Sequence, residues 1–427
     1  MTETSGGGVE WDSVASRRNR RRRHRADTRL KIYGIVAIVI AVGVLGILLT
    51  TLVSGGGSAF FQTRISAEFY IDPEIVSEDR VSARVFRDQI VPNSIAEMFP
   101  EASDDEVARA RSIFTRDTYV IVRDYVLKHP DAIGQTIELR VPASDAFDQL
   151  NKGVIDRELE EERRRVKDDD LVLWDQLVEE GRIDKAFAWG LFFSSDSRYP
   201  ELAGLKGAIV GSFYLLLVTF LISFPVGIAA AIYLEEFAPK NRFTSVVEVN
   251  INNLAAVPSV VFGLLGLAVF INFVGLPRSA PIVGGLVLSL MTLPTMIIVT
   301  RAALKAIPPS IREAGYGIGA SKHQVVLHHV LPLAIPGILT GTIIGLAQAL
   351  GEAAPLLLVG MNAFIADDPG GIMSKSTALP TQIFMWADSP ERGFVAKTSA
   401  GILVLLGFLI TMNAVAIYLR RRLERTW

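Results

Sequence analysis

The stretch Glu313-Ala314-Gly315, followed by Gly319 and then by Leu331-Pro332, lies between two long hydrophobic runs, residues 281–300 and 334–360. A bilayer core requires about 20 consecutive apolar residues for each helix that crosses it. The two runs therefore predict two membrane-spanning helices, and the more polar stretch between them predicts a loop outside the lipid.

The loop carries the pattern of a short helix. Pro308-Pro309 is expected to end the preceding helix, because proline cannot continue it. Ser310 is expected to cap a new helix over residues 311–318, since Glu313 follows at the spacing of a capping box. Gly319 then permits a sharp turn or the close approach of another backbone. Such a helix could transmit a rigid-body movement, and the plainer alternative is an ordinary amphipathic connector.

The composition excludes several classes of site. Half of the 427 residues are hydrophobic, which is too apolar for an ordinary soluble protein. The absence of cysteine excludes disulfides, thiolate metal sites and cysteine nucleophiles. None of the histidines has the partners of a zinc motif, so we expect no metal and no cofactor. The histidines are His24, His129, His323, His328 and His329.

Six hydrophobic segments are long enough to cross a bilayer, so we predict an α-helical polytopic membrane protein. The first, residues 31–53, exceeds the apolar part of a signal peptide, which is about 7–15 residues long. We expect it to be an uncleaved signal anchor, with a cleaved signal peptide as the alternative. The other five segments are residues 207–234, 250–274, 281–300, 334–360 and 397–419.

Basic residues flank both ends of the membrane region. Residues 1–30 form an arginine-rich tail, and Arg420-Arg421-Arg422 follows the last span. Because Lys and Arg collect on the cytoplasmic side, both termini are expected in the cytoplasm, and an even number of spans agrees. The loop at residues 301–333 then also faces the cytoplasm. The tail could instead bind nucleic acid or anionic lipid, but the span directly after it favours the topological explanation. The basic residues of the cluster are Arg17, Arg18, Arg20, Arg21, Arg22, Arg23, Arg25, Arg29 and Lys31.

Residues 54–204 are expected to form an extracytoplasmic domain between the first two spans, either α+β or mostly α. This segment holds 31 acidic and 19 basic residues and is long enough to form a compact, solvated domain. Residues 134–141 alternate like a strand, and Leu159 to Arg165 predicts a solvated helix face. Gly55-Gly56-Gly57 is expected to be a flexible joint. No catalytic pattern is evident, so a docking or spacer role is expected.

A second polar motif falls within the third predicted span. It runs from Asn253 through Pro258 and Ser259 to Gly263 and Gly266. Pro258 would remove a backbone hydrogen bond, and Ser259, about nine residues into the helix, would lie ~14 Å deep. Hydroxyls and freed backbone groups near the midplane are typical of a translocation pathway. The alternative is a proline kink with the two glycines as a helix contact.

A third polar motif falls within the fifth predicted span and comprises Gln348, Gly351, Glu352 and Pro355. A carboxylate there costs roughly 2.5–3.5 kcal/mol on insertion scales, so it needs a partner or water. An intramembrane acid is therefore a candidate pathway residue. The alternative is that Glu352 pairs with a cation of a neighbouring subunit and serves assembly.

The three motifs together resemble the permease subunits of ABC importers. The loop spacing resembles the segment by which such permeases contact an ATPase, and it would assign that contact to Glu313, Ala314, Gly315, Gly319, Leu331 and Pro332. The two intramembrane motifs are similar to those of phosphate importers. Residues 377–386 and the C-terminal end from Met412 are similar to the PstA branch rather than PstC. The resemblance covers about residues 195–427.

The sequence departs from this family at three positions. Gly315 stands where Ala is usual, His329 where Ile is frequent, and Gln348 where many members have Arg. Without that Arg, this helix lacks an obvious positive charge for phosphate.

The resemblance implies an inorganic phosphate importer. Its partners would be a second, PstC-like permease, two PstB-like ATPases, a periplasmic PstS-like phosphate-binding protein and membrane lipid, but no nucleic acid. The chain contains no G-x-x-x-x-G-K-[ST] motif, so we expect a non-catalytic subunit. The resemblance implies a location in the bacterial inner membrane. The alternatives are a permease for another oxyanion or small solute and, with less support, a membrane-anchored phosphate sensor.

Overall fold

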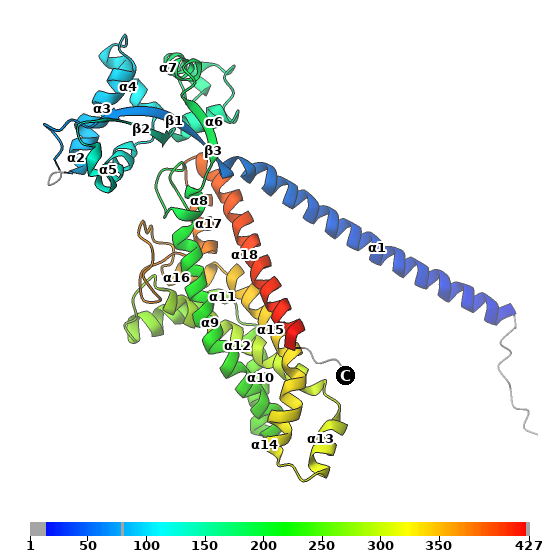
Figure 1. Ribbon diagram of the computed structural model, residues 1–427. Coiled ribbons are helices and arrows are strands. Elements are labelled where there is room, and N and C mark those ends of the chain that lie inside the picture. Colours follow the sequence, from blue (N-terminus) through cyan, green and yellow to red (C-terminus); the bar gives the residue numbers. More distant parts are fainter. Residues whose placement is uncertain (1–13, 78–80, 424–427) are drawn as a thin grey trace, which may run out of the picture. The chain divides into compact units, whose positions relative to one another are not determined.

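The computed structural model describes residues 14–77 and 81–423, which divide into two units, one ending at Ser54 and the other beginning at Gly55 (Figure 1). The first unit consists of α1, Val14–Gly56, which continues into the second unit only at its last two residues. Its apolar stretch is long and hydrophobic enough to cross a membrane. The predicted span at 31–53 falls within it. Residues 1–13 of the predicted tail lie outside the described residues.

The glycines after this span, predicted as a flexible joint, lie in helical turns. Gly55 and Gly56 belong to the last turn of α1, and Gly57 begins the short helix η1, Gly57–Phe60. A Cβ on Gly56 would lie 2.8 Å from the backbone nitrogen of Ala400. Gly56 is therefore a close-packing residue, because only a residue without a side chain permits that backbone contact.

The segment after η1 folds into an α+β domain around a three-stranded sheet of order β2-β1-β3. β1 is Phe61–Tyr70, β2 is Thr136–Pro142 and β3 is Ile183–Phe187, and both neighbours pair with β1 in antiparallel register. The strand predicted at 134–141 is thus confirmed as β2. The helices of the domain are α2 (Ala83–Val85) with η2 (Phe86–Ile90), α3 (Val91–Met98), α4 (Asp104–Ile113), α5 (Thr118–Lys128), η3 (Pro130–Ala132), α6 (Asp145–Asn151), η4 (Glu161–Arg163), α7 (Asp168–Glu179) and α8 (Gly190–Phe193).

Burial largely alternates along β1, so the apolar side chains on one face of this strand enter a core shared with the helices. Ile65, Phe69 and Phe86 are fully buried there, together with Trp174 of α7. The predicted helix face at Leu159 to Arg165 is wrong, because only the single turn η4 forms. That run has no apolar stripe to pack against the core, and packing is what stabilises most short helices.

Four further helices are long and apolar enough to cross a membrane. α12, Pro281–Lys305, is the most buried of them and packs against α9 and α15. The others are α9 (Lys206–Ile232, continued by η5, Tyr233–Phe237), the run α14–η7–α15 (Lys322–Val325, Val326–Val330 and Leu331–Gly351) and α18 (Gly393–Leu423). With α1, the described residues hold five such helices.

The third predicted span is not one straight helix. α10, Arg242–Ala255, and the helix formed by α11 (Ser259–Leu265) with η6 (Gly266–Phe273) are bent by 101°. The cause is Pro258, whose ψ of 137° is extended and which restricts the preceding Val257 as well. Ser259 therefore begins a helix instead of lying midway along one, and the depth estimate for it was wrong.

The fifth predicted span is also interrupted. α15 ends at Gly351, Glu352 has an extended ψ of 114°, and the short helix α16, Ala354–Leu358, begins with Pro355 in its first turn. Glu352 is therefore not within a continuous helix one turn after Gln348. The chain then reaches α17, Leu379–Ala387, before α18.

Candidate functional site

The loop between α12 and α14 contains the expected short helix. α13 spans Pro309–Gly317, close to the predicted 311–318. Its N-cap is Pro308, so Ser310 lies inside the helix and the predicted capping box at Ser310 and Glu313 is wrong. Two consecutive prolines fix the helical entry one residue earlier, since Pro309 is pre-shaped for the first turn.

The capping box of this loop lies further along the chain. The backbone N–H of Ser321 donates to Oε1 of Gln324 at 2.9 Å, and the N–H of Gln324 donates back to Ser321 Oγ at 3.5 Å. This box starts α14.

Two glycines shape the turn that follows α13. Gly319 has a φ of +81°, which confirms the predicted turn, and no atom of the described chain would approach a Cβ there. Gly315 is buried, and a Cβ on it would lie 2.8 Å from Cγ2 of Val325. The glycine at position 315 thus lets α13 pack closely on α14.

The predicted loop residues divide into two groups. Glu313 and Ala314 are exposed, and so are their neighbours Tyr316 and Ile318, of which Ile318 is 81% exposed. Leu331 and Pro332 instead lie in the first turn of α15, where Leu331 packs against a small apolar core. The exposed face of α13 is therefore the part of the loop available to a partner.

Arg312 holds α13 to the membrane helices. Its Nη2 lies 2.7 Å from Oε1 of Glu236 in η5, and it also donates to the carbonyls of Leu304 and Ile307 at 3.0 and 2.9 Å. Glu236 is only 7% exposed, so this charge-assisted pair is largely shielded from water. Because one side chain joins three segments, α13, η5 and the end of α12 are expected to move together.

A second arginine extends the same network. Nη2 of Arg301 donates to Glu248 of α10 at 2.8 Å, and its Nε donates to Glu235 of η5 at 3.2 Å. Lys305 lies 3.6 Å from Glu235. Sequence reasoning missed this loop-end network, although acidic residues at the end of one apolar run and basic residues at the end of another were visible. The network comprises Glu235, Glu236, Glu248, Arg301, Lys305 and Arg312.

The two intramembrane motifs meet in space. A Cβ on Gly263 of α11 would lie 2.7 Å from Cα of Pro355, and one on Gly266 would meet side chains of Val287 and Val359. The glycine contact weighed as an alternative for the second motif is thus present. Its partner is the third motif, which sequence reasoning did not connect with it.

The predicted polar pathway residues do not form one cluster within the chain. Asn253 is exposed on α10, Gln348 is exposed on α15, and Ser259 is partly buried. Glu352 is partly buried and forms no ion pair with any residue in the ranges 14–77 and 81–423.

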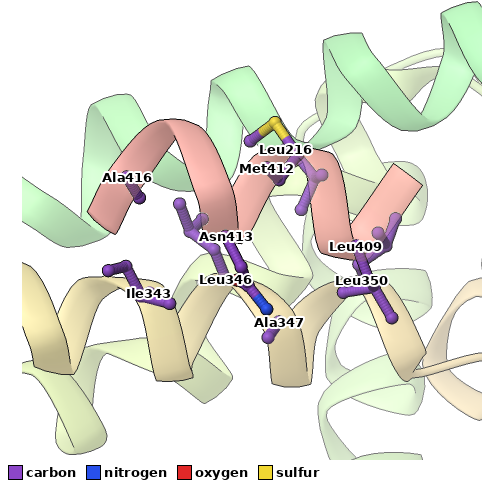
Figure 2. A pocket seen from close by; sticks show the side chains of 9 residues that line it. All are labelled: Leu216, Ile343, Leu346, Ala347, Leu350, Leu409, Met412, Asn413 and Ala416. Carbon is purple, nitrogen blue, oxygen red and sulfur yellow. The ribbon is translucent and has the colours of Figure 1, made fainter. Parts of the chain in front are cut away.

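A narrow crevice of about 30 Å³ separates α15, α18 and α9 (Figure 2). Leucine side chains from all three helices line it, and the amide of Asn413 extends from α18 toward Ala347 of α15. This space is too small and too apolar for a hydrated anion, so it is a packing defect and not a binding site.

Comparison with known proteins identifies a family and relatives that this chain resembles. Residues 223–425 match the family described as "Binding-protein-dependent transport system inner membrane component". YqgI of Bacillus subtilis, a probable ABC transporter permease protein, is 37% identical over 226 residues, which cover 49% of this chain and 76% of the relative. The chain belongs to this permease family.

Within the family the chain is of the PstA type. The phosphate transport system permease protein PstA of Yersinia pestis is 32% identical over 214 residues, covering 50% of this chain and 71% of the relative. PstA of Pasteurella multocida is 30% identical over 232 residues, covering 54% of this chain and 81% of the relative. The chain is accordingly a helical, multi-pass membrane permease of an ABC transporter.

The N-terminal part matches a different description. Residues 17–161 match a domain of unknown function, DUF3333. Among solved structures, the methionine ABC transporter MetNI in an inward-facing conformation is 19% identical over 52% of this chain and 95% of that chain, with a TM-score of 0.39. A bacterial alginate ABC transporter is 16% identical over 55% of this chain and 82% of that chain, with a TM-score of 0.42.

A buried lysine of the permease region bonds to the end of the α+β domain, near a buried ion pair inside that domain. Lys397 of α18 is 8% exposed, and its Nζ donates to the carbonyl of Ala203 at 2.8 Å. Asp148 of α6 accepts from the backbone N–H of Thr63 at 2.8 Å and pairs with Lys152 at 2.5 Å.

Glu201 completes this junction cluster, which we define as Asp148, Lys152, Glu201 and Lys397. Its Oε1 accepts from the Thr115 hydroxyl at 2.7 Å, and its backbone carbonyl accepts from Gln62 Nε2 at 2.6 Å. Burial raises the pKa of the Glu201 carboxyl, and the Thr115 hydrogen bond only partly opposes this. Sequence reasoning missed the whole cluster, because Glu201 and Lys397 are far along the chain from Asp148 and Lys152.

Proposed function

We propose that this chain is the permease subunit of an ATP-driven importer of inorganic phosphate. The observation that carries the proposal is its similarity to PstA phosphate transport permeases over about half of the chain, at 30–32% identity. The packing of the second polar motif on the third, through Gly263 and Pro355, supports it further. The subunit itself is non-catalytic, and a partner ATPase hydrolyses ATP.

The exposed face of α13, with Glu313 and Ala314, docks in a groove of the ATPase. A push on this helix reaches η5 and α12 through the contacts of Arg312 with Glu236 and with the Leu304 carbonyl of α12. Gly319 sets the direction of the chain after the helix, and Gly315, Leu331 and Pro332 support the loop from behind. Coupling thus occurs through residues 313–332.

The complete importer contains four kinds of subunit. Two permeases, this chain and a PstC-like one, enclose the pathway in the bacterial inner membrane, and two PstB-like ATPases lie below them. A PstS-like phosphate-binding protein delivers substrate from the periplasm. The bent pair of α10 with α11 and η6 counts as one crossing, which gives six with the five long helices.

Both termini then lie in the cytoplasm. The segments are a cytoplasmic tail (1–30), a signal anchor (31–53), an extracytoplasmic domain (54–204) and a permease domain (205–427) with its cytoplasmic loop at 301–333. This topology is testable because the chain has no native cysteine. An impermeant thiol reagent added to intact cells should label Val172→Cys of α7 but not Ser321→Cys of the loop. Labelling of position 321 from outside would contradict the arrangement.

Polar residues at the helix breaks line the pathway. Pro258 and Ser259 stand at one break, and Gly351, Glu352 and Pro355 at the other, while Asn253 and Gln348 lie on the helices that lead to them. Glu352 pairs with a cation of the partner permease and holds it beside the pathway, since a bare carboxylate would repel phosphate. Glu352→Gln should lower uptake while all subunits still co-purify, and unchanged uptake would contradict this role.

Uptake of radiolabelled phosphate by the reconstituted complex tests the substrate. Unlabelled phosphate should compete, whereas sulfate and molybdate should not. Competition by another oxyanion at equal concentration would favour a permease for that solute. Absence of any uptake by a complex that still hydrolyses ATP would favour the sensor alternative.

A further inference from the structure

Six aromatic side chains gather where the α+β domain joins the membrane helices. They are Phe60, Phe61, Phe187, Trp189, Phe192 and Phe193. Phe187 of β3 is central, with ring centroids 6.1 Å from Phe61 and 4.8 Å from Trp189, and Trp189 continues the row to Phe193 at 6.0 Å. The row is continuous although its members come from η1, β1, β3 and α8.

The two sides of this row differ in burial. Phe60 and Phe192 pack against an apolar core that includes Leu191, Leu205 and Ala400. The outer members do not: Phe61 is 44% exposed, Trp189 60% and Phe193 67%. We call these three residues the aromatic ridge. Their exposed area would be unfavourable in water and needs an apolar covering.

The ridge lies at the level where the chain enters the membrane. Leu205, which belongs to the same core, directly precedes α9, and Ala400 lies in the second turn of α18. Figure 1 shows α8 beside the start of α9, and contacts join the two helices. Trp is favoured at this depth of a membrane, because its ring is apolar apart from one N–H that can meet water, and the Phe rings add apolar area of the kind that interfacial segments bury.

A cation accompanies the ridge. Nζ of Lys185 lies 5.4 Å from the ring centroid of Phe61. An ammonium beside exposed aromatic rings matches a phospholipid, whose anionic phosphate lies just above its acyl chains. A protein partner would need complementary polar groups around the rings, whereas a lipid surface requires only this layered arrangement of apolar and positive groups.

We propose that the aromatic ridge of Phe61, Trp189 and Phe193 inserts into the headgroup layer of the bilayer and rests the α+β domain on lipid. The binding partner is the phospholipid surface, contacted by the three rings and by Lys185. This second attachment complements the junction cluster, which fixes the domain to α18. The inference depends on α9 and α18 crossing the membrane, but not on the substrate or on the side that the domain occupies.

Spin labelling of the full-length permease in phospholipid nanodiscs, co-expressed with its partner subunits, tests the inference. For each nitroxide, the accessibility to oxygen, which concentrates in lipid, is divided by the accessibility to a water-soluble nickel complex. This ratio should be several-fold higher for a nitroxide on Phe193→Cys than for one on Val172→Cys. Val172 of α7 is the matched control, because it is also apolar and 70% of its surface is exposed. Equal accessibility ratios at the two positions would overturn the proposal, and so would protection of position 193 from both reagents, which would indicate a protein partner.

A second measurement covers the possibility that the cysteine variant folds poorly. The fluorescence lost in Trp189→Phe reports the emission of Trp189 in the otherwise native protein. Lipids brominated near the headgroup should quench that emission more strongly than aqueous iodide does. Stronger quenching by iodide would place Trp189 in water and overturn the proposal.

Discussion

The loop-end network lies at one end of the permease region and the junction cluster at the other, and they stabilise these ends with different basic residues. The loop-end network uses arginine forks, and Arg301 and Arg312 are 17% and 19% exposed. The junction cluster uses lysines, and Lys397 and Lys152 are 8% and 9% exposed. Arginine can join several acceptors at once, whereas lysine concentrates its charge at one point.

This difference indicates different mechanical roles. In the loop-end network, Arg301 pairs with Glu235 and Glu248, whose side chains are 18% and 35% exposed. Salt screens these pairs more than the shielded Arg312–Glu236 pair, and they can exchange partners at modest cost. Contacts of that kind suit a loop that must transmit movement. Buried charges are costly to separate, because each one would be left without a partner in a poorly solvated place. They suit an attachment that does not move, so we expect the α+β domain to follow α18 as a rigid extension.

The largest effect is expected from Lys397→Met. The substitution keeps the length of the side chain but leaves the Ala203 carbonyl unpaired and removes a cation near Asp148 and Glu201. Loss of such a bond should lower the free energy of unfolding by about 2–3 kcal/mol. Thermal unfolding of the purified chain in detergent measures it. Lys375→Met is the control, because Lys375 is exposed. Equal melting temperatures for the two variants would show that the junction is not a fixed attachment.

Arg312→Gln should affect transport more than stability. It removes the pair with Glu236 and both carbonyl contacts, so α13 remains helical but loses its connection to η5 and α12. Uptake and binding-protein-stimulated ATP hydrolysis should both fall at least several-fold, while the subunits still co-purify. Arg242→Gln, at an exposed position of α10, is the control. Wild-type uptake in Arg312→Gln would mean that α13 transmits force by another route.

The sequence predicted the membrane helices and the loop helix but not the junction cluster, for a physical reason. The length of each apolar run located the membrane helices, and Pro308-Pro309 with Gly319 located the loop helix, because both signals are local. The junction cluster depends on Asp148, Glu201 and Lys397 meeting across different elements, which no local pattern contains.

The helix breaks show a different limit of sequence reasoning. Proline inside an apolar run predicts either a kink or a break, and the local sequence does not choose between them. The helix breaks at Pro258 and again at Glu352. The short helices that follow the two breaks, α11 and α16, pack against each other through Gly263 and Pro355. That contact is tertiary, so a reading that assumed continuous helices placed Ser259 and Glu352 wrongly.

Two glycines of the loop provide an internal comparison at intermediate magnitude. Gly317 and Gly319 both have open space around a Cβ, but only Gly319 has a positive φ. Gly319→Ala should strain the turn by about 1–2 kcal/mol and lower stimulated ATP hydrolysis. Gly317→Ala should be neutral or slightly stabilising, because it improves helix propensity. Equal activity of the two variants would show that the direction of the chain after α13 does not matter for coupling.

The smallest effect is expected from the titration of Glu201 in the junction cluster. Burial raises the pKa of this carboxyl in the folded protein, so the folded state binds its proton more tightly than the unfolded state does. The contribution of Glu201 to stability should therefore be highest below its unfolded pKa of about 4.3. It should fall as the pH rises toward the raised pKa of the folded state. Glu201→Gln keeps a neutral side chain of the same shape at every pH. Melting temperatures measured from acidic to neutral pH should decline less steeply in this variant than in the wild type. A parallel decline in both would mean that Glu201 is ionised in the folded protein and that the nearby Lys397 compensates its charge. The junction would then resemble the loop-end network, and the contrast between the two regions would rest on burial alone.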